Sequence, residues 1–276
     1  MTQSNYAWPG GRRIAVVFNV CLEGWSDGKA PGISPMGNPL PPTPGLVDTM
    51  AVSWAAYGMN RGIYRLLDSF RRFEAKASIM VSGVVAERAP EAVRACIDAG
   101  HEIMGHSYAM DVIPLLLSED AERANIERTT RLLTDVGAEV KGWLSPRGTP
   151  SIRSAQLLAE AGYTHFGDVF DQDLPYTQTY GSRSIVCIPF GTDVNDMPSM
   201  KHGREPSSML ESFVQNLEIA KKMGETTIID VTSHAHIFGR ARGAYYHERI
   251  IEAAMADEDV WVGTRAEIAE LHLNHR

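Results

Sequence analysis

GHEIMGHSYAMD, residues 100–111, is the stretch from which the fold of this 276-residue chain can be worked out. Its short apolar pair Ile103–Met104 predicts a buried strand, and a Gly-His-Ser turn follows at residues 105–107. The turn places His106 at the carboxyl end of that strand, where loops carry catalytic groups in α/β folds. One histidine in a turn is more often incidental than functional, so the interpretation depends on how the other strands end.

Other β-rich runs also end in polar side chains that can do chemistry. They are Arg13–Val20 before Cys21 and Glu23, Lys141–Leu144 before Arg147, Tyr163–Phe166 before Asp168 and Asp171, Ile185–Ile188 before Asp193, Asn195 and Asp196, and Thr227–Val231 before His234 and His236. Reactive residues at the same end of several strands are typical of a parallel barrel with its site on one face. Segments with helical spacing alternate with these runs. The sequence therefore predicts an α/β fold, most simply an irregular (β/α) barrel.

The length predicts one catalytic domain over residues 1–276, since a chain of this size forms a single barrel-type core more often than two domains. Residues 26–50 interrupt the strand–helix alternation. Ser26–Pro44 is rich in Pro, Gly and Ser and has no period, which predicts an irregular lid or subunit-contact loop.

Charge and cysteine content limit the partners and the compartment. A net charge of −8 and a pI near 5.6 argue against nucleic acid as the main partner. The three cysteines, Cys21, Cys96 and Cys187, are widely spaced and odd in number, which fits a reducing compartment. The N-terminus has neither the basic region nor the apolar core of a signal peptide, and no apolar run is long enough for a membrane span. We therefore expect a cytoplasmic protein that acts on a small molecule, without nucleic acid or membrane as a partner.

Five of the strand-end residues form the predicted catalytic set: Glu23, His106, Arg147, Asp171 and His234. The barrel would gather them at one mouth although they are far apart in the sequence. Such a set suits hydrolysis of an amide-like bond, in which a carboxylate or a bound metal activates water, an imidazole protonates the leaving nitrogen and an arginine steadies charge. Taken singly, each residue also has an ordinary structural interpretation, such as an acid that caps a turn.

A cysteine nucleophile is the less favoured alternative. Cys21 at a strand end could act as a thiolate with His106 or His234 as its base. Single intracellular cysteines are more often packed in the core.

Several segments together resemble the NodB-type polysaccharide deacetylase superfamily, and most of all its branch of PuuE-type allantoinases and cyclic imide hydrolases. The segments are AGHEI (99–103) with GH (105–106), GW (142–143) with Arg147, DLPY (173–176), DVNDM (193–197), His234 with GR (239–240), and YG (57–58) with RG (61–62). The resemblance spans nearly the whole chain. It implies a barrel, hydrolysis of a carbon–nitrogen bond other than a peptide bond, and a homo-oligomer. Six residues are then expected to bind substrate: Trp25, Tyr57, Tyr176, Asp193, Asn195 and His236.

The resemblance also bears on a metal cofactor. Metal-dependent members carry an aspartate in the first motif and a His-x-x-x-His pair. Here Glu23 stands near the aspartate position and His106 matches the first histidine, but Met110 occupies the second. A thioether is a poor zinc ligand in a site of oxygen and nitrogen donors. We therefore expect that no metal is required. A zinc-like ion, if bound, would be held by Glu23 and His106 and completed by a residue such as His236 or Asp111.

The leading hypothesis is a hydrolase that opens the ring of a small cyclic amide, imide or ureide. Glu23 would activate water, His106 and Arg147 would position it or the carboxylates, and His234 would protonate the leaving nitrogen. Asp171 would orient Arg147 or His234. The changed first motif, in which Cys21 replaces a typical carboxylate, argues against allantoin itself. The alternatives are a metal-dependent de-N-acetylase of amino sugars and a degenerate barrel that binds a small ligand without catalysis.

Overall fold

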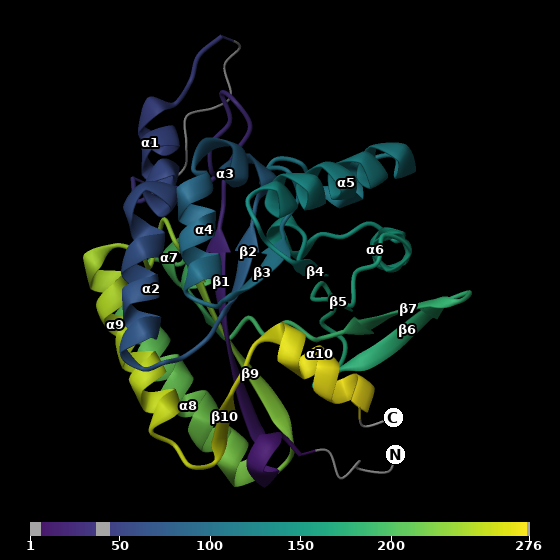
Figure 1. The fold of residues 1–276 in the computed structure, drawn as a ribbon. Helices are drawn as coiled ribbons and strands as arrows, with labels where there is room; N and C mark the ends of the chain where they lie inside the picture. The colour runs from purple at the N-terminus through teal and green to yellow at the C-terminus, as the bar shows by residue number, and fades with distance from the viewer. Residues whose placement is uncertain (1–6, 37–44, 275–276) are drawn as a thin grey trace.

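The computed structural model describes residues 7–36 and 45–274, and in it ten strands form one sheet (Figure 1). The strands are β1 (Ile14–Leu22), β2 (Ser78–Val81), β3 (Glu102–Gly105), β4 (Val140–Trp143), β5 (His165–Phe166), β6 (Tyr176–Tyr180), β7 (Arg183–Cys187), β8 (Val194–Asn195), β9 (Thr227–His234) and β10 (Val260–Val262). Their order is β6-β7-β5-β4-β3-β2-β1-β9-β8, and β10 also pairs with β1. Only the β6–β7 pair within this sheet is antiparallel. This is the predicted α/β architecture. In the described part of the chain the end strands β6 and β8 do not pair, so the barrel is irregular and incomplete.

Helices cover the sheet. They are α1 (Thr49–Tyr57), α2 (Ile63–Arg72), α3 (Gly83–Arg88), α4 (Pro90–Asp98), α5 (Glu119–Asp135), α6 (Ser154–Glu160), α7 (Asp196–Lys201), α8 (Ser207–Met223), α9 (Ala241–Met255) and α10 (Arg265–Asn274). Helix α9 packs on both α2 and α8 and forms one flank with them (Figure 1), while α3 contacts α4 and α5. None of the helices in the described ranges is long and apolar enough to cross a membrane.

Strand β1 is the centre of the sheet. All nine of its residues are buried, as its continuous apolar sequence IAVVFNVCL requires for a strand covered on both faces. Strand β9 runs along one side of it. On the other side, β10 pairs with the first part of β1 and β2 with the last part. In this register Cys21 lies directly opposite His234, so the first strand and the ninth bring their reactive residues to the same end of the sheet.

A glycine contact fixes the segment that follows β9. A π-helical turn, Gly58–Gly62, joins α1 to α2 and packs against this segment. A Cβ atom at Gly62 or at Gly239 would overlap the carbonyl oxygen of Ala235. Because only glycine allows this approach, the two glycines lock the backbone between His234 and His236 against the helical layer.

Five elements were not predicted; besides the three described next, they are the short helix α3 and the short strand β8. Helix α1 begins at Thr49, inside the segment predicted as a loop over residues 26–50, and the carboxylate of Asp48 caps it by accepting from the backbone N–H of Ala51 at 3.0 Å. Helix α7 is only six residues long. Strand β6 is a partly exposed edge strand whose polar sequence, YTQTY, carries no apolar alternation. Residues 37–44 of the predicted loop lie outside the described residues.

Candidate active site

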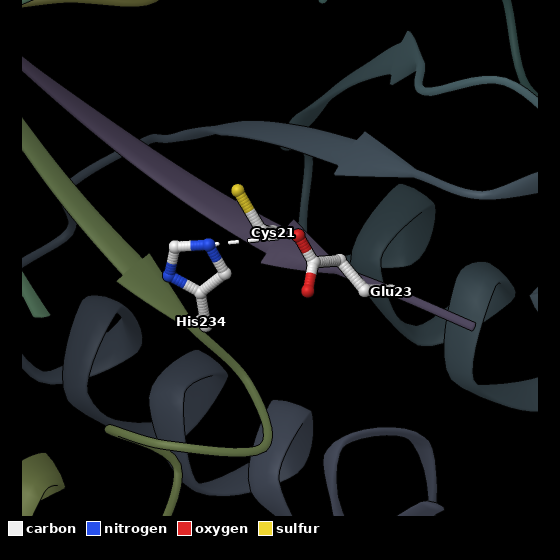
Figure 2. Close-up of side chains that lie close together, drawn as sticks. All are labelled: Cys21, Glu23 and His234. Carbon is white, nitrogen blue, oxygen red and sulfur yellow. Dashed lines mark ion pairs between the residues drawn. The ribbon is translucent and has the colours of Figure 1, made fainter. Parts of the chain in front are cut away.

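The carboxylate of Glu23, just beyond β1, is the centre of the candidate site. Its side chain is 3% exposed. Its Oε1 atom lies 3.6 Å from Nε2 of His106 and 3.5 Å from Nε2 of His234, and its Oε2 atom lies 3.8 Å from Nδ1 of His236. Figure 2 shows the ion pair between Glu23 and His234, which reach toward each other from the ends of β1 and β9. Three imidazoles thus surround one buried carboxylate.

His106 presents a lone pair to that carboxylate. Its Nδ1 atom lies 2.5 Å from the carbonyl oxygen of Leu144. A carbonyl can only accept, so Nδ1 carries the proton and, in the neutral ring, Nε2 is an acceptor. That Nε2 and the Oε2 of Glu23 have no hydrogen-bond partner among the described residues. Two buried acceptors, Nε2 of His106 and Oε1 of Glu23, therefore lie 3.6 Å apart, close enough for one donor molecule to bond to both.

His234 is held by Asp196 through both its ring and its backbone N–H. The ring Nδ1–H donates to one carboxylate oxygen at 2.6 Å, and the backbone N–H of His234 donates to the other at 2.8 Å. Asp196 is fully buried at the first position of α7. The pair turns Nε2 of His234 toward Glu23, and a proton on that nitrogen makes the ring an imidazolium that can act as an acid.

Burial and charge set the protonation states. Burial by itself raises the pKa of Glu23, but His234, His106 and His236 outweigh it and lower the pKa to about 2. Burial by itself lowers the pKa of His234, but Cys21, Glu23 and Asp196 outweigh it and hold that pKa well above its ordinary value. Near neutral pH the centre is therefore a carboxylate beside an imidazolium.

Cys21 lies next to this pair (Figure 2). One donor atom from each of Cys21, Glu23 and His234 lies within 4.8 Å of the other two. Cys21 is 3% exposed, and burial raises the pKa of its thiol. A thiol in this state is a poor nucleophile, which weighs against the cysteine alternative.

His236 stands between two indole rings. Its ring meets the ring of Trp54 edge-on at 4.7 Å and that of Trp25 edge-on at 5.6 Å between centroids. It is 1% exposed, and neither of its ring nitrogens has a partner among the described residues. Burial lowers its pKa to about 4, so the ring is neutral. Of the predicted substrate-binding residues, His236 and Trp25 therefore adjoin Glu23. Trp54, from the helix α1 that was not predicted, joins them.

Two predicted catalytic residues lie elsewhere. Arg147 is exposed on the turn after β4, in the left-handed region with φ 60°. Asp171 is also exposed and accepts a hydrogen bond from the hydroxyl of Tyr176 at 3.1 Å. The structure thus brings Glu23, His106 and His234 together, but not Arg147 or Asp171.

The remaining predicted substrate-binding residues make other contacts. The hydroxyl of Tyr57 accepts from Arg65 at 2.6 Å, and the guanidinium of Arg240 stacks on its ring. Asp193 is exposed, and the side chain of Asn195 caps α7 by accepting from the N–H of Met197 at 3.0 Å.

Two buried acids that hold the site were not chosen from the sequence. Asp196 holds His234, as described above. Asp168 accepts the N–H of Ser145 with both oxygens, at 2.8 and 2.9 Å, and so fixes the end of β4 whose Leu144 carbonyl holds His106. Burial raises the pKa of Asp168 to about 6. Both acids follow predicted strands, but spacing alone could not separate them from the neighbouring Asp171 and Asp193.

The metal-ligand positions implied by the family resemblance do not fit a metal here. Glu23 and His106 are in place, but the position of the second histidine is the thioether of Met110, whose backbone N–H bonds to the carbonyl of Gly24 at 2.9 Å. Met110 is buried. A cation beside Glu23 and His106 would therefore meet a poor third donor at that position.

Comparison with known proteins finds several polysaccharide deacetylases and an allantoinase among the similar proteins. Residues 56–166 match the family described as polysaccharide deacetylase. The crystal structure of PuuE allantoinase superposes with a TM-score of 0.88 at 27% identity and covers 97% of this chain and 93% of that one. A "probable polysaccharide deacetylase" from Pseudomonas aeruginosa PAO1 has the same TM-score at 26% identity, with 97% and 94% covered. A curated peptidoglycan deacetylase from Helicobacter pylori is 22% identical over 76% of this chain and 83% of its own length.

Proposed function

We propose, from the premise that this chain belongs to the NodB-type polysaccharide deacetylase superfamily and lies close to its PuuE branch, that it opens the ring of a small cyclic amide, imide or ureide. The general reaction class is hydrolysis of a carbon–nitrogen bond other than a peptide bond. The choice of a small ring as substrate is our proposal.

The observation that carries the proposal is the pair of acceptors at the centre. Nε2 of His106 and Oε1 of Glu23 are 3.6 Å apart. A water molecule about 2.8 Å from each atom would donate one hydrogen to each. Both acceptors would then direct a lone pair of the water oxygen toward a carbonyl carbon. This is how an attacking water is oriented in hydrolases.

The proton transfers follow from the protonation states. The carboxylate of Glu23 orients the water, and Nε2 of His106, kept as an acceptor because Nδ1 is bonded to the Leu144 carbonyl, takes the proton as the oxygen–carbon bond forms. The proton on Nε2 of His234 then goes to the ring nitrogen as the carbon–nitrogen bond breaks. One water is consumed, and the product carries a new carboxyl and a new amine or amide N–H. The transfer to His106 replaces the role in water activation expected for Glu23 from the sequence.

Enclosure favours a small substrate. Glu23, His106 and His234 are 3%, 2% and 7% exposed, and the indoles of Trp25 and Trp54 stand beside them around His236. A polymer substrate needs an open groove, whereas a flat heterocycle fits between aromatic rings. The neutral imidazole of His236 has one donor and one acceptor available for the ring's amide groups.

One observation favours the alternative of a de-N-acetylase acting on amino sugars. The curated relative from Helicobacter pylori is a peptidoglycan deacetylase. The same attack by water on an acetamide carbonyl would release acetate, with His234 protonating the sugar nitrogen.

Mass spectrometry of products distinguishes the two reactions. Purified protein is incubated with hydantoins, cyclic imides, ureides, lactams and N-acetylglucosamine oligomers. We expect a product heavier than its substrate by one water, formed only from a ring compound. Loss of an acetyl group from the oligomers would establish the deacetylase. The absence of any product, with a ligand-induced rise in melting temperature, would favour a binding protein.

The homo-oligomer and the cytoplasmic location remain proposals. Exposed apolar side chains precede and begin α1, among them Leu46, Val47, Met50 and Val52. Light scattering during size-exclusion chromatography would measure the assembly.

A further inference from the structure

We propose that Cys21, Glu23 and His234 form a binding site for a thiophilic divalent cation such as Zn²⁺, and that a cation held there blocks the hydrolysis proposed above. The binding site rests on geometry alone. Only the blocking of hydrolysis rests on the proposed function.

The three donors are of the types that zinc takes. They are a thiol sulfur, a carboxylate oxygen and an imidazole nitrogen, and their donor atoms lie within 4.8 Å of one another. Ligand distances of roughly 2.0–2.3 Å around a tetrahedral zinc place neighbouring donor atoms about 3.3–3.8 Å apart. Oε1 of Glu23 and Nε2 of His234 are 3.5 Å apart. That separation is too long for a good hydrogen bond and suits two ligands of one ion.

The surroundings of these donors are also those of a metal ligand set. A ligating histidine generally donates its other ring N–H to a carboxylate, and Nδ1–H of His234 donates to Asp196 at 2.6 Å. The Oε2 of Glu23 is buried with no hydrogen-bond partner among the described residues, and so is Nε2 of His106, which lies 3.6 Å from Oε1. A cation that binds this carboxylate through both oxygens would pair the one that the protein leaves without a partner.

The position differs from the one that the family resemblance implies. That set joins Glu23 to His106 and to the place of Met110. The set proposed here shares Glu23 but takes its other two donors from β1 and β9, whose register puts Cys21 opposite His234. The cysteine supplies a sulfur donor, and such a donor selects Zn²⁺ over Mg²⁺ or Ca²⁺.

The expected inhibition depends on one atom, Nε2 of His234. Nε2 of His234 can hold a proton or a cation, but not both. A cation on Nε2 removes the acid that the proposed hydrolysis needs, and it also occupies the carboxylate that orients the water.

Cobalt spectroscopy tests the site without any assay of activity. Metal-free wild-type protein is titrated with Co²⁺, and we expect the near-ultraviolet absorption of a thiolate–cobalt bond at one equivalent. Cys21→Ser should abolish this band. Cys96→Ser is the matched control and should keep the band, because Cys96 is also buried but lies in α4, where its thiol donates a hydrogen bond to the carbonyl oxygen of Ala92 at 3.3 Å. A wild-type protein without the band, or a Cys21→Ser protein that keeps it, would overturn the site.

A turnover assay tests the inhibition. Zn²⁺ should suppress ring opening by wild type and by Cys96→Ser, and a chelator should restore it. In Cys21→Ser the concentration for half inhibition should rise by more than about tenfold, the effect that losing even an outer-shell partner produces. If Zn²⁺ instead raises turnover while the cobalt band is present, the site stands and the acid role of His234 is wrong. If no substrate is turned over, the cobalt titration still decides the site.

Discussion

Asp196 accepts two hydrogen bonds from His234, one from the ring Nδ1 at 2.6 Å and one from the backbone N–H at 2.8 Å. The first bond fixes which ring nitrogen faces Glu23, and the second fixes where the end of β9 lies. Asp196 is thus a positioning residue, and its charge also helps to raise the pKa of His234.

Replacing Asp196 with Asn should move the pH profile. Activity requires protonated His234 and is lost as pH rises through its raised pKa. Without the carboxylate that pKa falls, so the alkaline limb of kcat/KM should shift to lower pH and kcat should decrease. The profile is measured on chelator-treated protein. Asp193→Asn, an exposed acid three residues earlier, is the control and should leave the limb in place. If the alkaline limb of kcat/KM does not shift in Asp196→Asn, the carboxylate of Asp196 does not set the pKa of His234.

His234→Gln should lower kcat by about 10²–10⁴-fold, the contribution of a positioned acid or base. Glutamine keeps polar atoms near Asp196 but cannot donate an acidic proton. His202→Gln, at an exposed site after α7, should match wild type. Turnover of the substrate identified by mass spectrometry is the measurement, and circular dichroism checks the fold. Turnover by His234→Gln within a few-fold of wild type would exclude it as the acid.

Glu23→Gln separates water orientation from negative charge. The amide oxygen can still accept from the water, but the negative charge that attracts the imidazolium of His234 is lost. We expect kcat to fall by at least about tenfold, and by more in Glu23→Ala, where the acceptor is also gone. Equal losses in the two variants would mean that the charge, rather than the acceptor, is what catalysis uses.

His247 should make the fold sensitive to acid. It lies between Phe18 and Phe70, its two ring nitrogens have no partner among the described residues, and burial lowers its pKa to about 3. The unfolded chain takes up this proton below about pH 6.5, whereas the folded chain does not until near pH 3. The free energy of unfolding should therefore fall as pH falls below about 6.5.

His247→Leu tests this loss. Urea titrations at pH 7 and pH 5 should show a smaller loss of unfolding free energy for the variant than for wild type. His202→Gln is the surface control and should behave as wild type does. An equal loss in His247→Leu would place the acid sensitivity elsewhere.

The strand–helix alternation and the central histidines could be predicted because they depend on local pattern. A buried run such as residues 14–18 is apolar whatever surrounds it, and the residue after a parallel strand always emerges at the same edge. Glu23, His106 and His234 were found in this way.

The choice among neighbouring polar residues could not be predicted, because it depends on turns of one or two residues. Asp196 reaches His234 because it is the first residue of α7, which Asn195 caps, and Asp193 is left exposed before this turn. Arg147 is exposed in a turn where its φ is 60°, a conformation that no local pattern predicts for an arginine. Trp54 lies on α1, a helix that was not predicted because it follows directly on a Pro-rich stretch. The position of each of these residues depends on tertiary packing, which the periodicity of the sequence does not reveal.

The pairing of β1 with β10 has a consequence for synthesis on the ribosome. Ile14 lies beside Val260. Strand β1 therefore has all of its neighbouring strands only after almost the whole chain has been translated. His234 likewise arrives late, on β9. Contacts of such large sequence separation form slowly, and a nascent chain that ends before β9 exposes an apolar strand edge. Premature termination of this chain should therefore yield aggregates rather than a smaller active barrel.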